Sequence, residues 1–132
     1  MIFARYSVVF ATIAVLALSA QERDQEQIAG TWRGESSCAV KETACHDETV
    51  VYRFLKIPEK PGYFSISADK IVDGKAVNMG TLEFQYREDQ HELVCDYAQG
   101  VWRLKVDGAK MDGTLTRADN TIFRRVTLRK DP

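Results

Sequence analysis

The chain has 132 residues, of which 45% are hydrophobic, 28% charged and 10% aromatic. These values are typical of one globular domain and exclude a disordered or collagen-like chain. Its 18 basic and 19 acidic side chains leave a formal net charge of −1, which lacks the clustered basic excess that nucleic-acid binding requires. We therefore expect no nucleic-acid partner.

The first 20 residues have the pattern of an export signal. A single cation at Arg5 precedes an apolar run from Ser7 to Leu18, and the run ends in small residues at Ala20. A membrane anchor is the alternative, but a spanning helix needs about 20 apolar residues, and this run stops at the polar stretch Gln21 to Gln27. The sequence therefore predicts a signal peptide over residues 1–20 and a secreted or periplasmic protein that has no contact with the membrane after cleavage.

The mature chain is predicted to begin with a flexible polar lead, residues 21–29, and to form one all-β domain over residues 30–130. Period-two alternation and β-branched or aromatic residues recur between turn-forming pairs such as Asp73-Gly74 and Asp107-Gly108. The predicted strands are Gly30 to Cys38, Asp47 to Ile57, Gly62 to Val72, Ala76 to Arg87, His91 to Ala98, Val101 to Val106, Ala109 to Arg117 and Thr121 to Lys130.

These short connections favour antiparallel pairing between strands that are neighbours in sequence. An eight-stranded up-and-down barrel removes all exposed strand edges and is the predicted fold, with a two-sheet sandwich as the alternative. Alternation places several large aromatic side chains on the inward face. The candidate ligand-binding residues of the barrel interior are Tyr52, Phe54, Phe84, Tyr86, Tyr97 and Trp102.

The three cysteines point to one disulfide, because an oxidising compartment favours disulfides over metal-bound thiols. Cys38 and Cys45 are separated by a short polar stretch that can form a turn and bring the sulfurs together. Cys95 is then left over in an apolar strand, and a buried free thiol is its simplest role. Its pairing stays open at this point.

Two segments resemble the lipocalin-like, or calycin, superfamily. They are Gly30-Thr31-Trp32 at the start of the first strand and Ile122-Phe123-Arg124-Arg125-Val126 in the last. The resemblance, closest to small exported members of this group, implies that Trp32 packs beneath the barrel floor. It also implies that Arg124 stacks on the indole, which would explain an arginine on an inward face. Unlike true lipocalins, the sequence predicts no helix after the last strand.

Motifs for catalysis or metal binding are weak. Cys45-His46-Asp47-Glu48 offers metal-ligand types, but its spacing fits no zinc pattern, and the disulfide competes for the thiols. His46 next to Cys45, and His91 four residues before Cys95, are poorly placed for a Cys/His nucleophile pair. We expect no catalytic residues, no bound metal and no cofactor.

The favoured hypothesis is an exported, non-enzymatic protein that binds a small apolar molecule in or at the mouth of the barrel. The alternative is a protein-interaction module, such as a periplasmic protease inhibitor, that uses the polar lead or the disulfide turn as its contact element. That alternative would gain if side chains filled the barrel completely. A metal-binding protein or thiol enzyme is less favoured.

Overall fold

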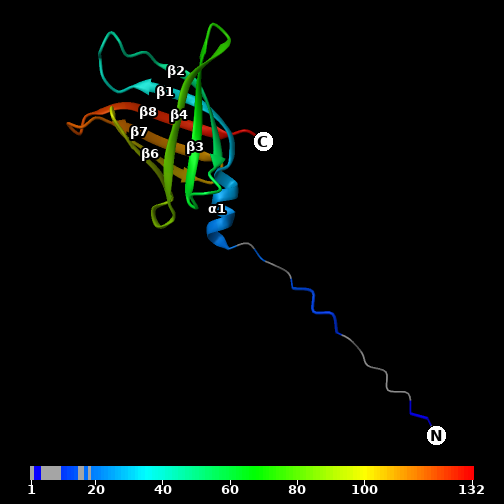
Figure 1. Cartoon of the computed structure of the whole chain (residues 1–132). Helices are drawn as coiled ribbons and strands as arrows, with labels where there is room; N and C mark the ends of the chain where they lie inside the picture. The colour runs from blue at the N-terminus through cyan, green and yellow to red at the C-terminus, as the bar shows by residue number, and fades with distance from the viewer. Residues whose placement is uncertain (1, 4–9, 15–16, 18) are drawn as a thin grey trace.

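A closed antiparallel barrel is the main feature of the computed structural model, which describes residues 2–3, 10–14, 17 and 19–132 (Figure 1). Each strand pairs with the next one in the chain, and the last strand pairs with the first. The predicted eight-stranded barrel is confirmed, and the alternative of a two-sheet sandwich is wrong. The strands are β1 (Gly30–Cys38), β2 (Glu48–Lys56), β3 (Tyr63–Val72), β4 (Lys75–Arg87), β5 (Glu92–Tyr97), β6 (Gly100–Asp107), β7 (Lys110–Thr116) and β8 (Ile122–Lys130).

A short helix, α1 (Ala20–Ile28), precedes the barrel in place of the expected flexible lead. Ser19 and Glu22 form a capping box at its start, which satisfies backbone N–H groups that the first turn leaves free. Ile28 is fully buried, and its carbonyl accepts a 2.8 Å hydrogen bond from the indole Nε1 of Trp32. The helix therefore belongs to the barrel, and we refer to the end that it contacts as the helix end.

The described residues include no helix long and apolar enough to cross a membrane. Half of the expected export signal, residues 1–20, falls outside the part of the chain that the structure describes, so the signal stays a prediction.

The core fills the half of the barrel nearest α1. Trp32 and Phe54 pack with their ring centroids 6.0 Å apart, and both are fully buried. Around them lie other buried, inward-facing apolar side chains from the remaining strands. They include Phe64, Leu93, Leu104, Met111 and Leu128. The opposite end carries the loops 39–47, 73–74, 98–99 and 117–121, and we refer to it as the disulfide end.

The pairing of β1 with β8 corrects the expected contact between Trp32 and Arg124. Lys130 lies opposite Trp32, whereas Arg124 lies opposite Cys38, six positions or about 20 Å along the strand. Arg124 does face inward, as predicted, but at the disulfide end. There it donates to the Ser36 hydroxyl at 3.2 Å and to the His46 carbonyl at 2.9 Å, and it lies 3.6 Å from a Glu48 carboxylate oxygen. These partners, rather than an indole face, offset the cost of its burial.

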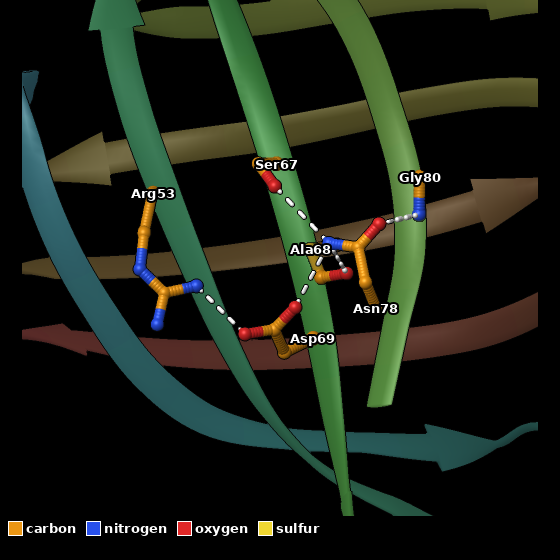
Figure 2. A network of polar contacts seen from close by, with 6 residues as sticks. All are labelled: Arg53, Ser67, Ala68, Asp69, Asn78 and Gly80. Atoms are coloured by element: carbon orange, nitrogen blue, oxygen red, sulfur yellow. Dashed lines mark hydrogen bonds and ion pairs between the residues drawn. The ribbon is translucent and has the colours of Figure 1, made fainter. Parts of the chain in front are cut away.

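The pairing of β3 with β4 shifts at a bulge next to Ala68 and Asp69 (Figure 2). The Asn78 side chain donates to Asp69 at 2.9 Å and accepts a bond from the backbone N–H of Gly80, while Arg53 of β2 donates to the other Asp69 oxygen at 2.7 Å. Asp69 is only 7% exposed, and the Arg53 guanidinium holds the pKa of its carboxyl below the usual range. This network holds the backbone at the bulge, where the strand bends locally.

Pairing between β4 and β5 is short. Among residues 19–132, these two strands pair at only three positions, Gln85 with Val94, Tyr86 with Leu93 and Arg87 with Glu92. Toward the disulfide end, β4 continues to pair with β3 and β5 continues to pair with β6. Over that half, the described pairing does not join β4 to β5, and we refer to this unpaired stretch as the opening between β4 and β5.

Gly34 allows the first and last strands to close the barrel. A Cβ added there would lie 1.8 Å from the backbone carbonyl oxygen of Thr127 in β8, closer than any real contact. The ion pair between Arg33 and Asp131 lies along the same line of pairing. This line between β1 and β8 is the closing seam of the molecule.

Candidate functional site

A cavity of about 390 Å³ occupies the barrel on the side of the disulfide end and is partly open to solvent. Its wall is mainly apolar and aromatic, which is the usual composition of a small-molecule pocket. All its lining residues lie on β2 to β6 or the turn after β5: Tyr52, Ile66, Ala68, Met79, Gly80, Thr81, Leu82, Phe84, Tyr97, Gln99, Trp102 and Leu104. The barrel is therefore filled at one end and hollow at the other.

Four of the six side chains that the sequence predicted for ligand binding line this cavity: Tyr52, Phe84, Tyr97 and Trp102. Phe54 and Tyr86 do not. Phe54 is fully buried against Trp32, and the Tyr86 hydroxyl donates to Asp24 of α1 at 3.1 Å. Both belong to the filled helix end, because they lie farther along their strands from the disulfide end than Tyr52 and Phe84 do.

Two tyrosines bring polar groups to the apolar wall. Burial, with a further contribution from the nearby Glu48 carboxylate, raises the pKa of Tyr52, which is 7% exposed. Burial also raises the pKa of Tyr97, whose hydroxyl donates to the side-chain oxygen of Gln99 at 3.3 Å. Both phenols are therefore neutral near pH 7, so each presents a hydroxyl and no charge to a molecule in the cavity.

Three contacts hold the loop between β1 and β2 at the disulfide end. Cys38 and Cys45 form the predicted disulfide, with an S–S distance of 2.09 Å. Arg117 makes a bidentate ion pair with Glu42 at 2.9 and 2.8 Å, and the Asp47 carboxylate accepts the backbone N–H of Cys38. These contacts fix the loop against the turn between β7 and β8.

The residues considered for metal binding and catalysis have structural partners instead. The disulfide occupies two of the thiols, and Glu48 lies against Arg124. Cys95 is a buried free thiol whose pKa is raised, chiefly by burial. The described residues contain no group of three histidine, cysteine or acidic side chains arranged to hold a metal ion.

Sequence reasoning identified the aromatic part of the cavity and missed its rim. Ile66, Ala68, Leu82 and Leu104 lie at alternate, inward-facing positions of their strands, so period-two alternation was the available signal. Met79, Gly80 and Gln99 carried no such signal, because their position depends on the β3–β4 bulge and on the opening beside β5. Both features are set by pairing between strands.

Comparison with known proteins rests on the fold, since no family model and no curated protein sequence matches the chain. One similar solved structure is the siderocalin Ex-FABP, described as functioning through dual ligand specificities. It has a TM-score of 0.56 and 12% identity, with 80% of this chain and 74% of that chain covered. The fold is lipocalin-like. A second similar structure is the odorant-binding protein OBP1, with a TM-score of 0.51, 12% identity and coverage of 89% and 77%.

At 12% identity, the similarity to these two proteins concerns the fold alone. Within that fold, this lipocalin-like barrel keeps a tryptophan at the helix end, as the Gly30-Thr31-Trp32 motif implied. The inward arginine of its last strand is at the opposite end, beside the disulfide loop.

Proposed function

We propose that this lipocalin-like protein is an exported, non-enzymatic binder of a small, mainly apolar molecule, held in the cavity between β2 and β6. The observation that carries the proposal is the cavity of about 390 Å³, lined by aromatic and aliphatic side chains inside a barrel whose other half is solid. Similarity to a siderocalin and an odorant-binding protein supports the same class of function. The disulfide supports export, because such bonds persist in oxidising compartments.

The neutral hydroxyls of Tyr52 and Tyr97 favour a ligand with one hydrogen-bonding group on an otherwise apolar body. Apolar contact would supply most of the affinity, and a hydroxyl would orient the molecule. The probe for the test is N-phenyl-1-naphthylamine, a compact neutral aromatic amine whose fluorescence rises in apolar surroundings.

The experiment is a fluorescence titration of the folded protein with this probe. We expect saturable binding that Ala68→Phe weakens at least tenfold, because a phenyl group there would occupy the cavity. Ala109→Phe is the matched control, since Ala109 is exposed in the turn between β6 and β7 and is expected to leave binding unchanged. Absence of saturable binding, or equal effects of the two substitutions, would contradict the proposal.

A protein-interaction role is the second candidate, and exposed apolar side chains favour it. Val72, Val77 and Met79, near the tip of the β3–β4 hairpin, are each 42–43% exposed. The polar lead can no longer be offered as a flexible contact element, since it forms α1. A protein that binds no probe, yet forms a stable complex through this hairpin, would favour the second candidate.

A further inference from the structure

The open stretch of wall between β4 and β5 leads directly to the cavity. If the pairing continued in its register, Glu83 would lie opposite Asp96 and Thr81 opposite Ala98, but the described pairing ends at Gln85 and Val94. Thr81 and Leu82 on one side of this opening, and Tyr97 and Gln99 on the other, all line the cavity. In the described barrel, β1, β7 and β8 contribute none of the lining residues.

At the point where the pairing ends, the inward-facing side chains become more exposed to solvent. Phe84 and Cys95, beside the last pair, are 4% and 6% exposed. Leu82 and Tyr97, the next inward positions on the same two strands, are only half-buried. The interior is therefore more exposed on the disulfide side of the last pair than beside it.

Two acidic side chains flank the opening. Glu83 and Asp96 are exposed, and in the extrapolated register they are the first outward pair beyond Val94. Like charges placed directly opposite each other destabilise pairing between strands. Lys60 contacts Glu83 at 2.7 Å, so one of the two carboxylates is partly compensated and Asp96 is the stronger source of negative potential.

We propose that the opening between β4 and β5, with Thr81 and Leu82 on one side and Tyr97 and Gln99 on the other, is the entrance through which the ligand reaches the cavity. The entrance selects neutral or cationic ligands over anionic ones because Glu83 and Asp96 flank it. This inference rests on the proposed function. It excludes a route past the loop 39–47, which the Arg117–Glu42 ion pair and the hydrogen bond from Arg124 to the His46 carbonyl hold in place.

The first test closes the opening by a chemical cross-link. The variant carries Glu83→Cys and Asp96→Cys in a Cys95→Ala background and is treated with the short cross-linker bismaleimidoethane. We expect the association and dissociation rates of N-phenyl-1-naphthylamine, measured by stopped-flow fluorescence, to fall at least tenfold, with little change in the equilibrium affinity. The same variant with each new cysteine capped by N-ethylmaleimide is the control for the substitutions themselves.

A second cross-link tests the competing route. Glu42 and Arg117 already touch across the disulfide end, so Glu42→Cys with Arg117→Cys in the same background places the cross-linker there. We expect this cross-link to leave both rates within about twofold. The inference is wrong if this second cross-link slows ligand exchange and the first does not. It is also wrong if the first cross-link changes neither rate. Failure of the unmodified protein to bind the probe would overturn the proposed function itself, so the two failures are distinguishable.

Two probes with the same ring system and different charge test whether the entrance selects by charge. 8-Anilino-1-naphthalenesulfonate has the ring system of N-phenyl-1-naphthylamine with an added sulfonate. We expect Asp96→Asn to speed association of the sulfonate probe at least threefold at low salt and to leave the neutral probe unchanged. Equal responses of the two probes would contradict a charged entrance. Added salt should remove the difference between the two probes, because it screens exposed charges.

Discussion

At the scale of single residues, Arg124 shows how a charged side chain can face the inside of a barrel. Its guanidinium touches the Ser36 hydroxyl and the His46 carbonyl and lies near Glu48, and the side chain is only 13% exposed. Ser36 is itself 2% exposed, so removal of the arginine would leave buried polar groups without a partner. The contacts explain why the sequence can tolerate an ionised group at this position.

We predict that Arg124→Ala lowers the free energy of unfolding by roughly 2–4 kcal/mol, somewhat less than the about 3–5 kcal/mol for one partner of a fully buried ion pair, because both side chains of this pair are partly exposed. Arg125→Ala, on the exposed outer face, should stay within about 0.5 kcal/mol. Urea denaturation of the two variants measures the difference. In double-mutant cycles, Arg124 should couple to Glu48→Gln and show no coupling to Trp32→Phe. Coupling to Trp32 instead would contradict the register between β1 and β8.

Cys95 is the other residue whose surroundings determine its chemistry. Burial raises the pKa of its thiol, and the thiolate is the reactive form. We predict that iodoacetamide at pH 8 modifies Cys95 at least tenfold more slowly in the folded protein than in urea, while Cys38 and Cys45 stay unmodified until a reductant is added. Mass spectrometry of tryptic peptides identifies the sites. Rapid modification of Cys95 in the folded protein would show that the inward face of β5 is accessible.

At the scale of elements, the β3–β4 bulge depends on one buried carboxylate. Because Arg53 and Asn78 lower the pKa of Asp69 in the folded state, its contribution to stability is present above the unfolded value of about 3.9. That contribution is lost as the pH falls from the pKa of Asp69 in the unfolded state through its lower pKa in the folded state. The unfolded state binds the proton first, so acid favours unfolding through this group.

We predict that lowering the pH from 7 to 3 shifts the urea midpoint of the wild type more than that of Asp69→Asn. The variant has no proton to bind at this position and should already be less stable at pH 7. Asp107→Asn, on an exposed carboxylate at the end of β6, should keep the wild-type response. Midpoints from tryptophan fluorescence at the two pH values provide the comparison. An identical acid response in Asp69→Asn would assign the loss to other groups.

The same elements show which features local sequence can predict. Period-two alternation predicted the strands and inward residues such as Tyr52 and Phe84, because each signal lies within a few positions of chain. Helix α1 gave no such signal, since Ile28 is its only buried residue and its Ser19 cap falls within the expected signal peptide. The position of Arg124, the bulge and the short β4–β5 pairing depend on register between strands, which no single segment specifies.

At the scale of the whole molecule, closure of the barrel depends on Gly34. An alanine there would place its Cβ 1.8 Å from the Thr127 carbonyl oxygen, and backbone on both sides of the closing seam would have to move. We predict that Gly34→Ala lowers the free energy of unfolding by about 2 kcal/mol or more. Glu35→Ala, at the next and exposed position, should lower it by much less. Thermal denaturation followed by circular dichroism compares the two variants, and equal midpoints would contradict a tightly closed seam.

The closing seam also sets the order in which the chain can fold. Arg33 and Asp131 are 98 positions apart, so pairing of β1 with β8 closes a loop of almost the whole domain and must wait until the final strand is available. Contacts this distant in sequence make folding slow, on the scale of milliseconds to seconds for β proteins. Until then β1 and β7 each present an edge of unpaired backbone groups, which are templates for association with other chains. A chain that stops before Ile122 would keep both edges permanently and should self-associate.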